Sequence, residues 1–307
     1  MEAANLFTIQ NPNNIAALPV SYLLANLQAC FLEEIDGFKQ IYIQETKAHG
    51  LKEKIDYCLL DHKITEVASI NQDRQISLYE NFNQYLWCTS YALLSIYVEG
   101  YEIPRKTGQY MGTLDDNRYV EEGYWVFSNG LSLLREYQNE VFCQIPNPKT
   151  IDEKEYALKA NGIYCYAMRF VMLHEFAHHY YGHTKGAKDL EAFIQNETIA
   201  DEYALKKIVQ CFSEKEGRTQ KFGIIAAMVS LLLMQKENRK PEEYQDLAKR
   251  LFDLINSLAL PDDEDDLWGI ASFGIKLWAV HIGKILIENK IYDTHKELFL
   301  ALHAQLS

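Results

Sequence analysis

The stretch Val171–His178, which reads VMLHEFAH, contains two histidines four residues apart with a glutamate directly after the first. On an α-helix, residues four apart lie on one face, so His174 and His178 can direct two imidazoles at one metal ion. Glu175 is rotated by about 100° round the helix, where it can hold a water molecule at that ion. The spacing therefore predicts a hydrolytic zinc site on a helix.

The residues before His174 extend this helix and indicate which side of it is buried. Apolar residues recur at helical spacing, and the stripe continues through His174 and His178; its members are Ile163, Ala167, Phe170 and Val171. A lone histidine on an apolar face is usually a core residue with a satisfied hydrogen bond. Two histidines beside an acid cost on the order of several kcal/mol to bury without a partner, and a bound cation removes that cost. We expect this helix to cover Asn161–Tyr181 and to end at Gly182.

A second helix is predicted over Leu190–Phe212, with Asp189 as its N-cap. Its small alanines would let it approach the first helix closely. We expect Glu197 to be a third metal ligand and Asp201 to accept a hydrogen bond from a ligand histidine, which fixes the tautomer of that histidine. The alternative, a solvated acidic face, predicts carboxylates away from apolar side chains. One face of the predicted helix instead mixes the two kinds of residue: Phe193, Glu197, Ala200, Asp201, Ala204 and Ile208.

The HExxH pattern that begins at His174, followed by ExxAD from Glu197 to Asp201, resembles the gluzincin metallopeptidases. The resemblance implies that His174, His178 and Glu197 bind Zn²⁺. It also implies that Glu175 is the catalytic base and that Asp201 supports a ligand histidine. The activity implied is hydrolysis of a peptide bond.

Within the gluzincins, the chain resembles the Lit-type phage-exclusion peptidases. The resemblance lies in the motif HEFAHH, the chain length and the intracellular character. That resemblance implies cleavage of a translation elongation factor, which blocks phage growth. Regulatory proteases of the ImmA/IrrE kind also carry HExxH followed by a helix with an ExxA(D/N) pattern, and they are the nearest alternative. A fused DNA-binding helix-turn-helix would favour them, whereas the acidic charge argues against one. A further alternative is a non-catalytic interaction protein in which a structural metal only locks two helices together.

Other zinc patterns fit the chain less well. Metzincins require a glycine seven residues and a histidine ten residues after the first histidine, but Tyr181 and Thr184 occupy those positions. A closed structural site has four protein ligands, commonly thiolates, and Cys165 and Cys211 are too distant along their helices to complete one. Three protein ligands with a fourth position for water are the catalytic arrangement. The group that would stabilise the oxyanion is not identified by the sequence.

The composition is that of an ordinary globular protein, with 48% hydrophobic and 24% charged residues. A net charge of −13 disfavours nucleic acid and anionic membranes as partners. The six cysteines include no CxxC, which is typical of a reducing compartment. The N-terminus lacks the features of a signal peptide, and the apolar stretch Phe222–Met234 is too short to span a bilayer. We therefore expect a cytoplasmic protein that acts on a protein or peptide substrate; its oligomeric state is open.

Helical periodicity runs through the chain and predicts a mainly α fold with a minor β component, built round the HExxH helix and the adjacent ExxAD helix. Strands are expected in Ile41–Gln44 and Lys54–Ala68, as candidates for an edge strand that holds substrate. The segment Tyr101–Arg118 is expected to be a long loop that serves as a lid. The sequence Pro146–Pro148 marks a boundary between a helical N-terminal region, 1–145, and a metal-bearing region, 146–307. Further helices are expected over Val20–Gly37, Ser77–Glu99, Val120–Gln138, Phe222–Lys236, Pro241–Leu258, Leu267–Glu288 and Asp293–Gln305.

Overall fold

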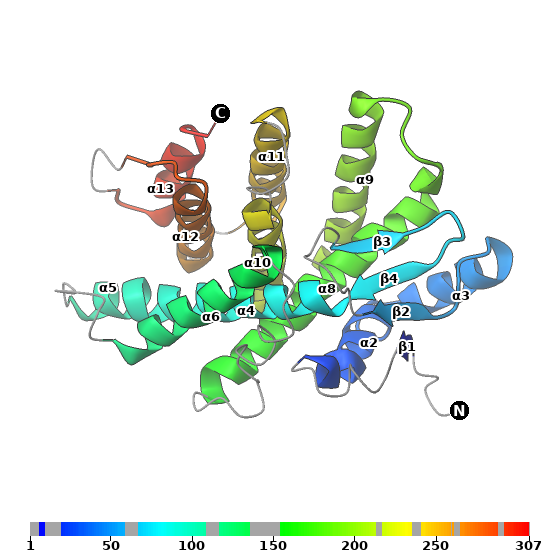
Figure 1. Cartoon of the computed structure of the whole chain (residues 1–307), viewed down its shortest axis with the longest axis horizontal. Coiled ribbons are helices and arrows are strands. Elements are labelled where there is room, and N and C mark those ends of the chain that lie inside the picture. Colours follow the sequence, from blue (N-terminus) through cyan, green and yellow to red (C-terminus); the bar gives the residue numbers. More distant parts are fainter. Residues whose placement is uncertain are drawn as a thin grey trace.

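The computed structural model of the chain describes residues 6–9, 20–58, 67–108, 117–135, 154–212, 217–234, 241–258, 260, 265–287 and 292–306. Within these residues the protein is mainly helical with one small sheet, which confirms the predicted fold class (Figure 1). No helix in the described part combines the length and the hydropathy that crossing a bilayer requires.

The predicted helices are found, with ends that differ by up to seven residues from those expected. The α-helices are α2 (Leu24–Leu32), α3 (Phe38–Ala48), α4 (Glu80–Tyr97), α5 (Ile103–Thr107), α6 (Arg118–Arg135), α8 (Lys154–Tyr180), α9 (Leu190–Val209), α10 (Gly217–Met234), α11 (Pro241–Ser257), α12 (Asp265–His281) and α13 (His295–His303). Shorter segments are the 3-10 helix η1 (Ser21–Leu23), the π-helix η2 (Val98–Glu102) and the 3-10 helix η4 (His183–Lys185).

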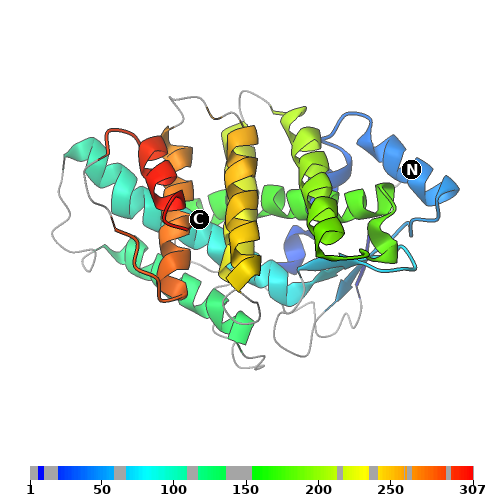
Figure 2. The same cartoon turned by 90° about the horizontal axis from the view of Figure 1, so that it is seen from above.

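Helix α8 is the central element and carries the HExxH sequence near its C-terminal end. It packs against α2, α4, α9, α10 and one strand of the sheet. Helices α9, α11 and α12 stand side by side across α8 and α4 (Figures 1 and 2). On α10, a Cβ built at Gly223 would lie 2.9 Å from the backbone nitrogen of Ala167, so only glycine permits this close crossing of α10 and α8. The tight packing makes α8 a rigid support for its side chains.

The sheet lies beside α8 and has the strand order β1-β2-β4-β3. Strands β1 (Phe7–Ile9), β2 (Ile55–Cys58) and β4 (Ile76–Tyr79) are parallel to one another, whereas β3 (Ala68–Ile70) is antiparallel to β4. Strand β3 therefore forms an edge of the sheet as described, and it is the strand that packs against α8. The strands predicted within Lys54–Ala68 are confirmed in part, because β2 lies inside this segment and β3 begins at its last residue.

The strand predicted over Ile41–Gln44 is wrong, because these residues belong to helix α3. Phe38, Tyr42 and Glu45 are buried at helical spacing on one face of α3. The rings of Phe38 and Tyr42 pack against Phe176 of α8, with centroids 5.0 and 6.0 Å away. Tertiary packing of this face outweighs the β propensity of two isoleucines.

Three other expectations concern the segments around helix ends. The helix predicted from Ser77 begins only at Glu80, because Ile76–Tyr79 forms β4. The loop predicted over Tyr101–Arg118 is wrong in its first part, where η2 and α5 continue the helical path to Thr107. Residues 109–116 and the boundary at Pro146–Pro148 lie outside the described residues, so the lid and the division into 1–145 and 146–307 stay predictions.

Candidate metal centre

The HExxH side chains come from the last turns of α8, as the sequence predicts. The apolar stripe that precedes them is buried along its whole length. The side chains of His174 and His178 are 12% and 13% exposed, so both imidazoles face the interior. The helix ends at Tyr180, and Gly182 follows with a φ of 76°, a left-handed conformation that favours glycine.

Helix α9 brings two carboxylates to the same place. Its N-cap is Asp189, whose side chain accepts a hydrogen bond of 2.8 Å from the backbone N–H of Ala192, as predicted. Ala200 and Ala204 are fully buried where α9 packs on α8, which is consistent with the close approach expected of small residues. Phe193 departs from the prediction, because it is 45% exposed and does not share the buried face.

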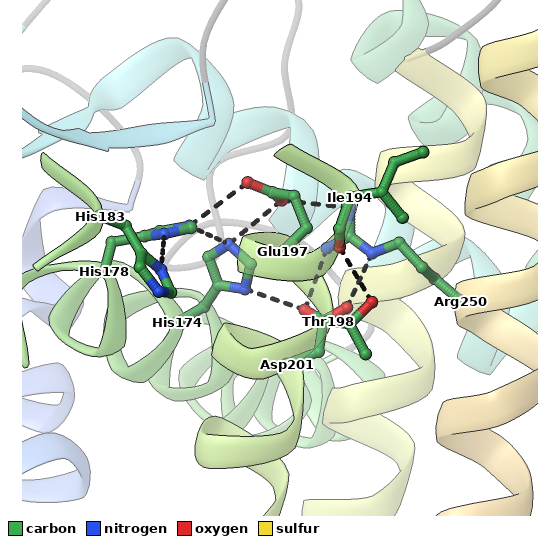
Figure 3. A network of polar contacts seen from close by, with 8 residues as sticks. All are labelled: His174, His178, His183, Ile194, Glu197, Thr198, Asp201 and Arg250. Carbon is green, nitrogen blue, oxygen red and sulfur yellow. Dashed lines mark hydrogen bonds and ion pairs between the residues drawn. The ribbon is translucent and has the colours of Figure 1, made fainter. Parts of the chain in front are cut away.

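Two imidazoles and one carboxylate converge between α8 and α9 (Figure 3). The Nε2 atoms of His174 and His178 are 3.0 Å apart. Glu197 Oε2 lies 3.4 Å from Nε2 of His174, and Glu197 Oε1 lies 3.3 Å from Nε2 of His178. The ligands of a tetrahedral zinc ion at about 2.0–2.2 Å are about 3.3–3.6 Å from one another, and the three separations here are within about 0.3 Å of that range. The three residues can therefore hold a metal.

Asp201 supports His174 from the side opposite the convergence point. Its Oδ1 lies 2.9 Å from Nδ1 of His174. When Nδ1–H donates to this carboxylate, the lone pair of Nε2 is directed at the point shared with His178 and Glu197. The structure thus brings together all the ligands expected from the sequence and Asp201 behind one of them.

Arg250 of α11 also reaches this site, which the sequence analysis missed. Its Nε donates to Oδ2 of Asp201 at 2.7 Å, and its Nη2 donates to Oδ1 at 3.0 Å. Its Nη1 lies 3.2 Å from Oε2 of Glu197. The guanidinium is 11% exposed and spans the two carboxylates, so it compensates their mutual repulsion (Figure 3). The sequence did contain a signal for it, because Arg250 directly precedes Leu251, and Leu251 and Leu254 are apolar residues at helical spacing that are buried. A charged residue at the border of a buried helix face is a candidate for a buried ion pair.

The charges in the site act strongly on one another. Burial raises the pKa of Glu197 and Asp201, but the histidines and the Arg250 charge outweigh burial and hold both pKa values below their usual range. Burial lowers the pKa of His174, yet the hydrogen bonds to Asp201 and Glu197 prevail and raise it to about 10. Both carboxylates are therefore anionic, as a metal ligand and its support must be, and a metal ion held here would compete with a proton for His174.

Glu175 lies near His174 and His178, and its carboxylate contacts the edge strand β3. Burial raises the pKa of Glu175, while the charges of His174 and His178 act in the opposite direction. A hydrogen bond from the backbone of Ile70 in β3 fixes its carboxylate. The side chain is thus half-buried, with the two HExxH histidines on one side and an edge strand on the other.

Two further histidines, His179 and His183, lie close to the HExxH residues in the chain. His179 is 7% exposed, and its Nε2 lies 3.1 Å from Oε2 of Glu45 in α3. His183 is half-buried, and its Nδ1 lies 3.1 Å from Nδ1 of His178.

Asp201→Ala is expected to weaken zinc affinity by about 10-fold to 100-fold without removing a ligand, because His174 loses the acceptor that orients it. Asp201→Asn keeps an acceptor oxygen and should lose less. Competition with a chromophoric chelator measures both affinities, and Glu202→Ala, which removes the exposed neighbouring carboxylate, is the control. An unchanged affinity in Asp201→Ala would reject this role.

Comparison with known families matches the chain to the model described as Peptidase U49. The match covers residues 76–271 of the 307-residue chain, which is more than half of it and includes His174, Glu175, His178, Glu197, Asp201 and Arg250. Searches of curated proteins and of solved structures found no match. The matched span runs from β4 to α12 and thus contains α8, α9 and α11, the three helices that supply the site. On this evidence the chain belongs to the Peptidase U49 family.

Proposed function

We propose that this protein is a zinc-dependent endopeptidase of the gluzincin type that cleaves a protein substrate. In this proposal His174, His178 and Glu197 bind zinc, and Glu175 is the catalytic base. The observation that carries it is the convergence of two Nε2 atoms and one carboxylate, 3.0–3.4 Å apart, beside a fourth side chain suited to proton transfer. Membership of a peptidase family supports the same reaction.

The bound zinc would polarise the attacking water and the scissile carbonyl. Glu175 accepts a proton from the water and later donates it to the leaving amine, so the hydroxyl remains on the carbonyl carbon. Burial raises the pKa of Glu175, which makes its carboxylate a better proton acceptor than an exposed glutamate. Asp201 orients His174, and the charge of Arg250 helps to keep the carboxylates of Glu197 and Asp201 in their anionic form.

Strand β3 is the element that would hold the substrate. It is an edge strand of the described sheet, it packs against α8, and its Ile70 backbone bonds to Glu175. An extended peptide that pairs with β3 would add a strand to the sheet and bring its backbone next to the base. This arrangement favours a peptide bond as the target over a small-molecule substrate.

The resemblance to Lit-type peptidases supports a finer proposal. We infer that the substrate is a translation elongation factor, that cleavage excludes phage, and that the enzyme acts in the cytoplasm. The net charge of −13 argues against nucleic acid or an anionic membrane as a partner and against the DNA-binding domain of an ImmA/IrrE-like regulator.

Zinc loading tests the metal assignment directly. We expect one zinc per chain by elemental analysis, and at a free zinc concentration 100 times Kd the ion should add about 2.7 kcal/mol to the free energy of unfolding. Chelation should remove both that stabilisation and peptide-bond hydrolysis, and zinc should restore them. His49→Ala removes the side chain of the residue that follows α3, outside the proposed ligand set, and keeps the backbone N–H that caps the helix; it should change neither property. Full hydrolysis by metal-free protein would refute the proposal.

A further inference from the structure

Each of the two ligand histidines needs a hydrogen-bond acceptor at Nδ1, because that bond fixes its tautomer and orientation. The acceptors of the two histidines differ. His174 has the carboxylate of Asp201 at 2.9 Å. His178 has the imidazole of His183, with 3.1 Å between the two Nδ1 atoms (Figure 3). We propose that His183 is a positioning residue that accepts the Nδ1–H of His178 and so directs the Nε2 lone pair of His178 at the metal. The inference rests on the proposed zinc site.

The chain reversal after α8 is what brings His183 to His178. Residues five apart on a continuous helix are separated by about 140° round the axis, so their side chains cannot meet. Helix α8 stops at Tyr180, Gly182 takes the left-handed conformation, and η4 starts at His183. The turn folds His183 back over the last turn of the helix, with ring centroids of His178 and His183 5.3 Å apart.

Aromatic side chains hold His183 in this orientation. The ring of Tyr181 stacks on it, with centroids 5.9 Å apart and an angle of 22° between the planes. Tyr181 in turn makes an edge contact with Tyr203 of α9 at 5.9 Å. The orientation of His183 is thus fixed by both site helices, which a residue that merely caps α8 would not require.

Hydrogen-bond chemistry then sets the tautomers of both rings. An imidazole that binds a metal through Nε2 carries its proton on Nδ1 and must donate there. His183 can accept only as a neutral ring with its proton on Nε2. Since a neutral acceptor gives a weaker hydrogen bond than a carboxylate, His183 should hold its ligand less firmly than Asp201 does.

Two variants of His183 separate an acceptor from a structural residue of the turn. His183→Ala removes the acceptor and should lower zinc affinity by about 10-fold, the low end of the range for groups that orient metal ligands. His183→Asn offers its side-chain oxygen near the position of Nδ1 and should stay within about 3-fold of wild type. Lys185→Ala alters an exposed residue of the same turn and should leave the affinity unchanged.

Zinc affinity is measured by chelator competition, and nitrogen-15 NMR of labelled histidine reports the tautomers. In zinc-loaded wild type we expect His178 to be protonated on Nδ1 and His183 on Nε2. An unchanged affinity in His183→Ala, or an equal loss in both His183 variants, would overturn the inference. If wild type still binds zinc in that case, the proposed zinc site stands without this role of His183. Wild-type protein that binds no zinc would instead refute the proposed function, and this inference with it.

Discussion

Glu175→Gln is expected to slow peptide-bond hydrolysis by about 10²-fold to 10⁴-fold, the usual contribution of a positioned general base. Glutamine has nearly the same shape and cannot accept the proton of the attacking water. Its side-chain oxygen can still accept the hydrogen bond from the Ile70 backbone, so the fold and the contact with β3 should persist. Zinc affinity should remain near that of wild type, because the three ligands are unchanged. Steady-state cleavage of a purified elongation factor, together with zinc content, measures both properties.

The control for this substitution is Glu202→Gln, which changes an exposed carboxylate on α9 and should leave cleavage intact. In cells, new protein N-termini should appear with wild type and be absent with Glu175→Gln, which also identifies the substrate. If Glu175→Gln cleaves as fast as wild type, Glu175 is not the base. If neither protein cleaves anything while both bind zinc, the metal has a structural role and the protein is an interaction module.

Arg250→Met is expected to lower the free energy of unfolding by about 3–5 kcal/mol in metal-free protein. Methionine keeps much of the aliphatic stem but removes the charge that compensates Asp201 and Glu197, whose side chains are 11% and 17% exposed. The two buried carboxylates would then lose the guanidinium that spans them and keep His174, whose pKa is raised to about 10, as the cation beside both. Urea unfolding in the presence of a chelator measures the loss.

Saturating zinc should reduce this penalty, because the ion supplies positive charge to Glu197 directly. The control is Arg218→Met, which breaks an ion pair with Asp266 at the surface, where the arginine is 61% exposed. It should cost no more than about 1 kcal/mol. Equal losses in the two arginine variants, or a loss at Arg250 that zinc leaves unchanged, would contradict the compensating role of Arg250.

The parts of the site that the sequence predicts are those encoded by local spacing. His174 and His178 are one helical turn apart, as are Glu197 and Asp201, so periodicity alone assigns each pair to a face. Asp189 as N-cap and the left-handed Gly182 are likewise local signals, and both are confirmed. The assignment of roles to these residues remains a prediction.

The missed contacts depend on tertiary structure. Arg250 lies 49 residues after Asp201, and only the packing of α11 against α9 brings them together. His183 meets His178 because α8 ends at Tyr180 and the chain turns back at Gly182. Ile41 and Ile43 favour a strand locally, but the aromatic face of α3 against α8 determines the outcome.

The length of β3 has a consequence for selectivity. If substrate pairs with β3 as proposed, three residues at about 3.4 Å each would give a docking edge of roughly 10 Å, enough to align a few backbone groups of a bound chain. So few main-chain contacts cannot discriminate among the many extended segments in a cell. An enzyme built this way must obtain its discrimination from the folded shape of its target around the cleavage point, which would spare unstructured peptides of the same local sequence.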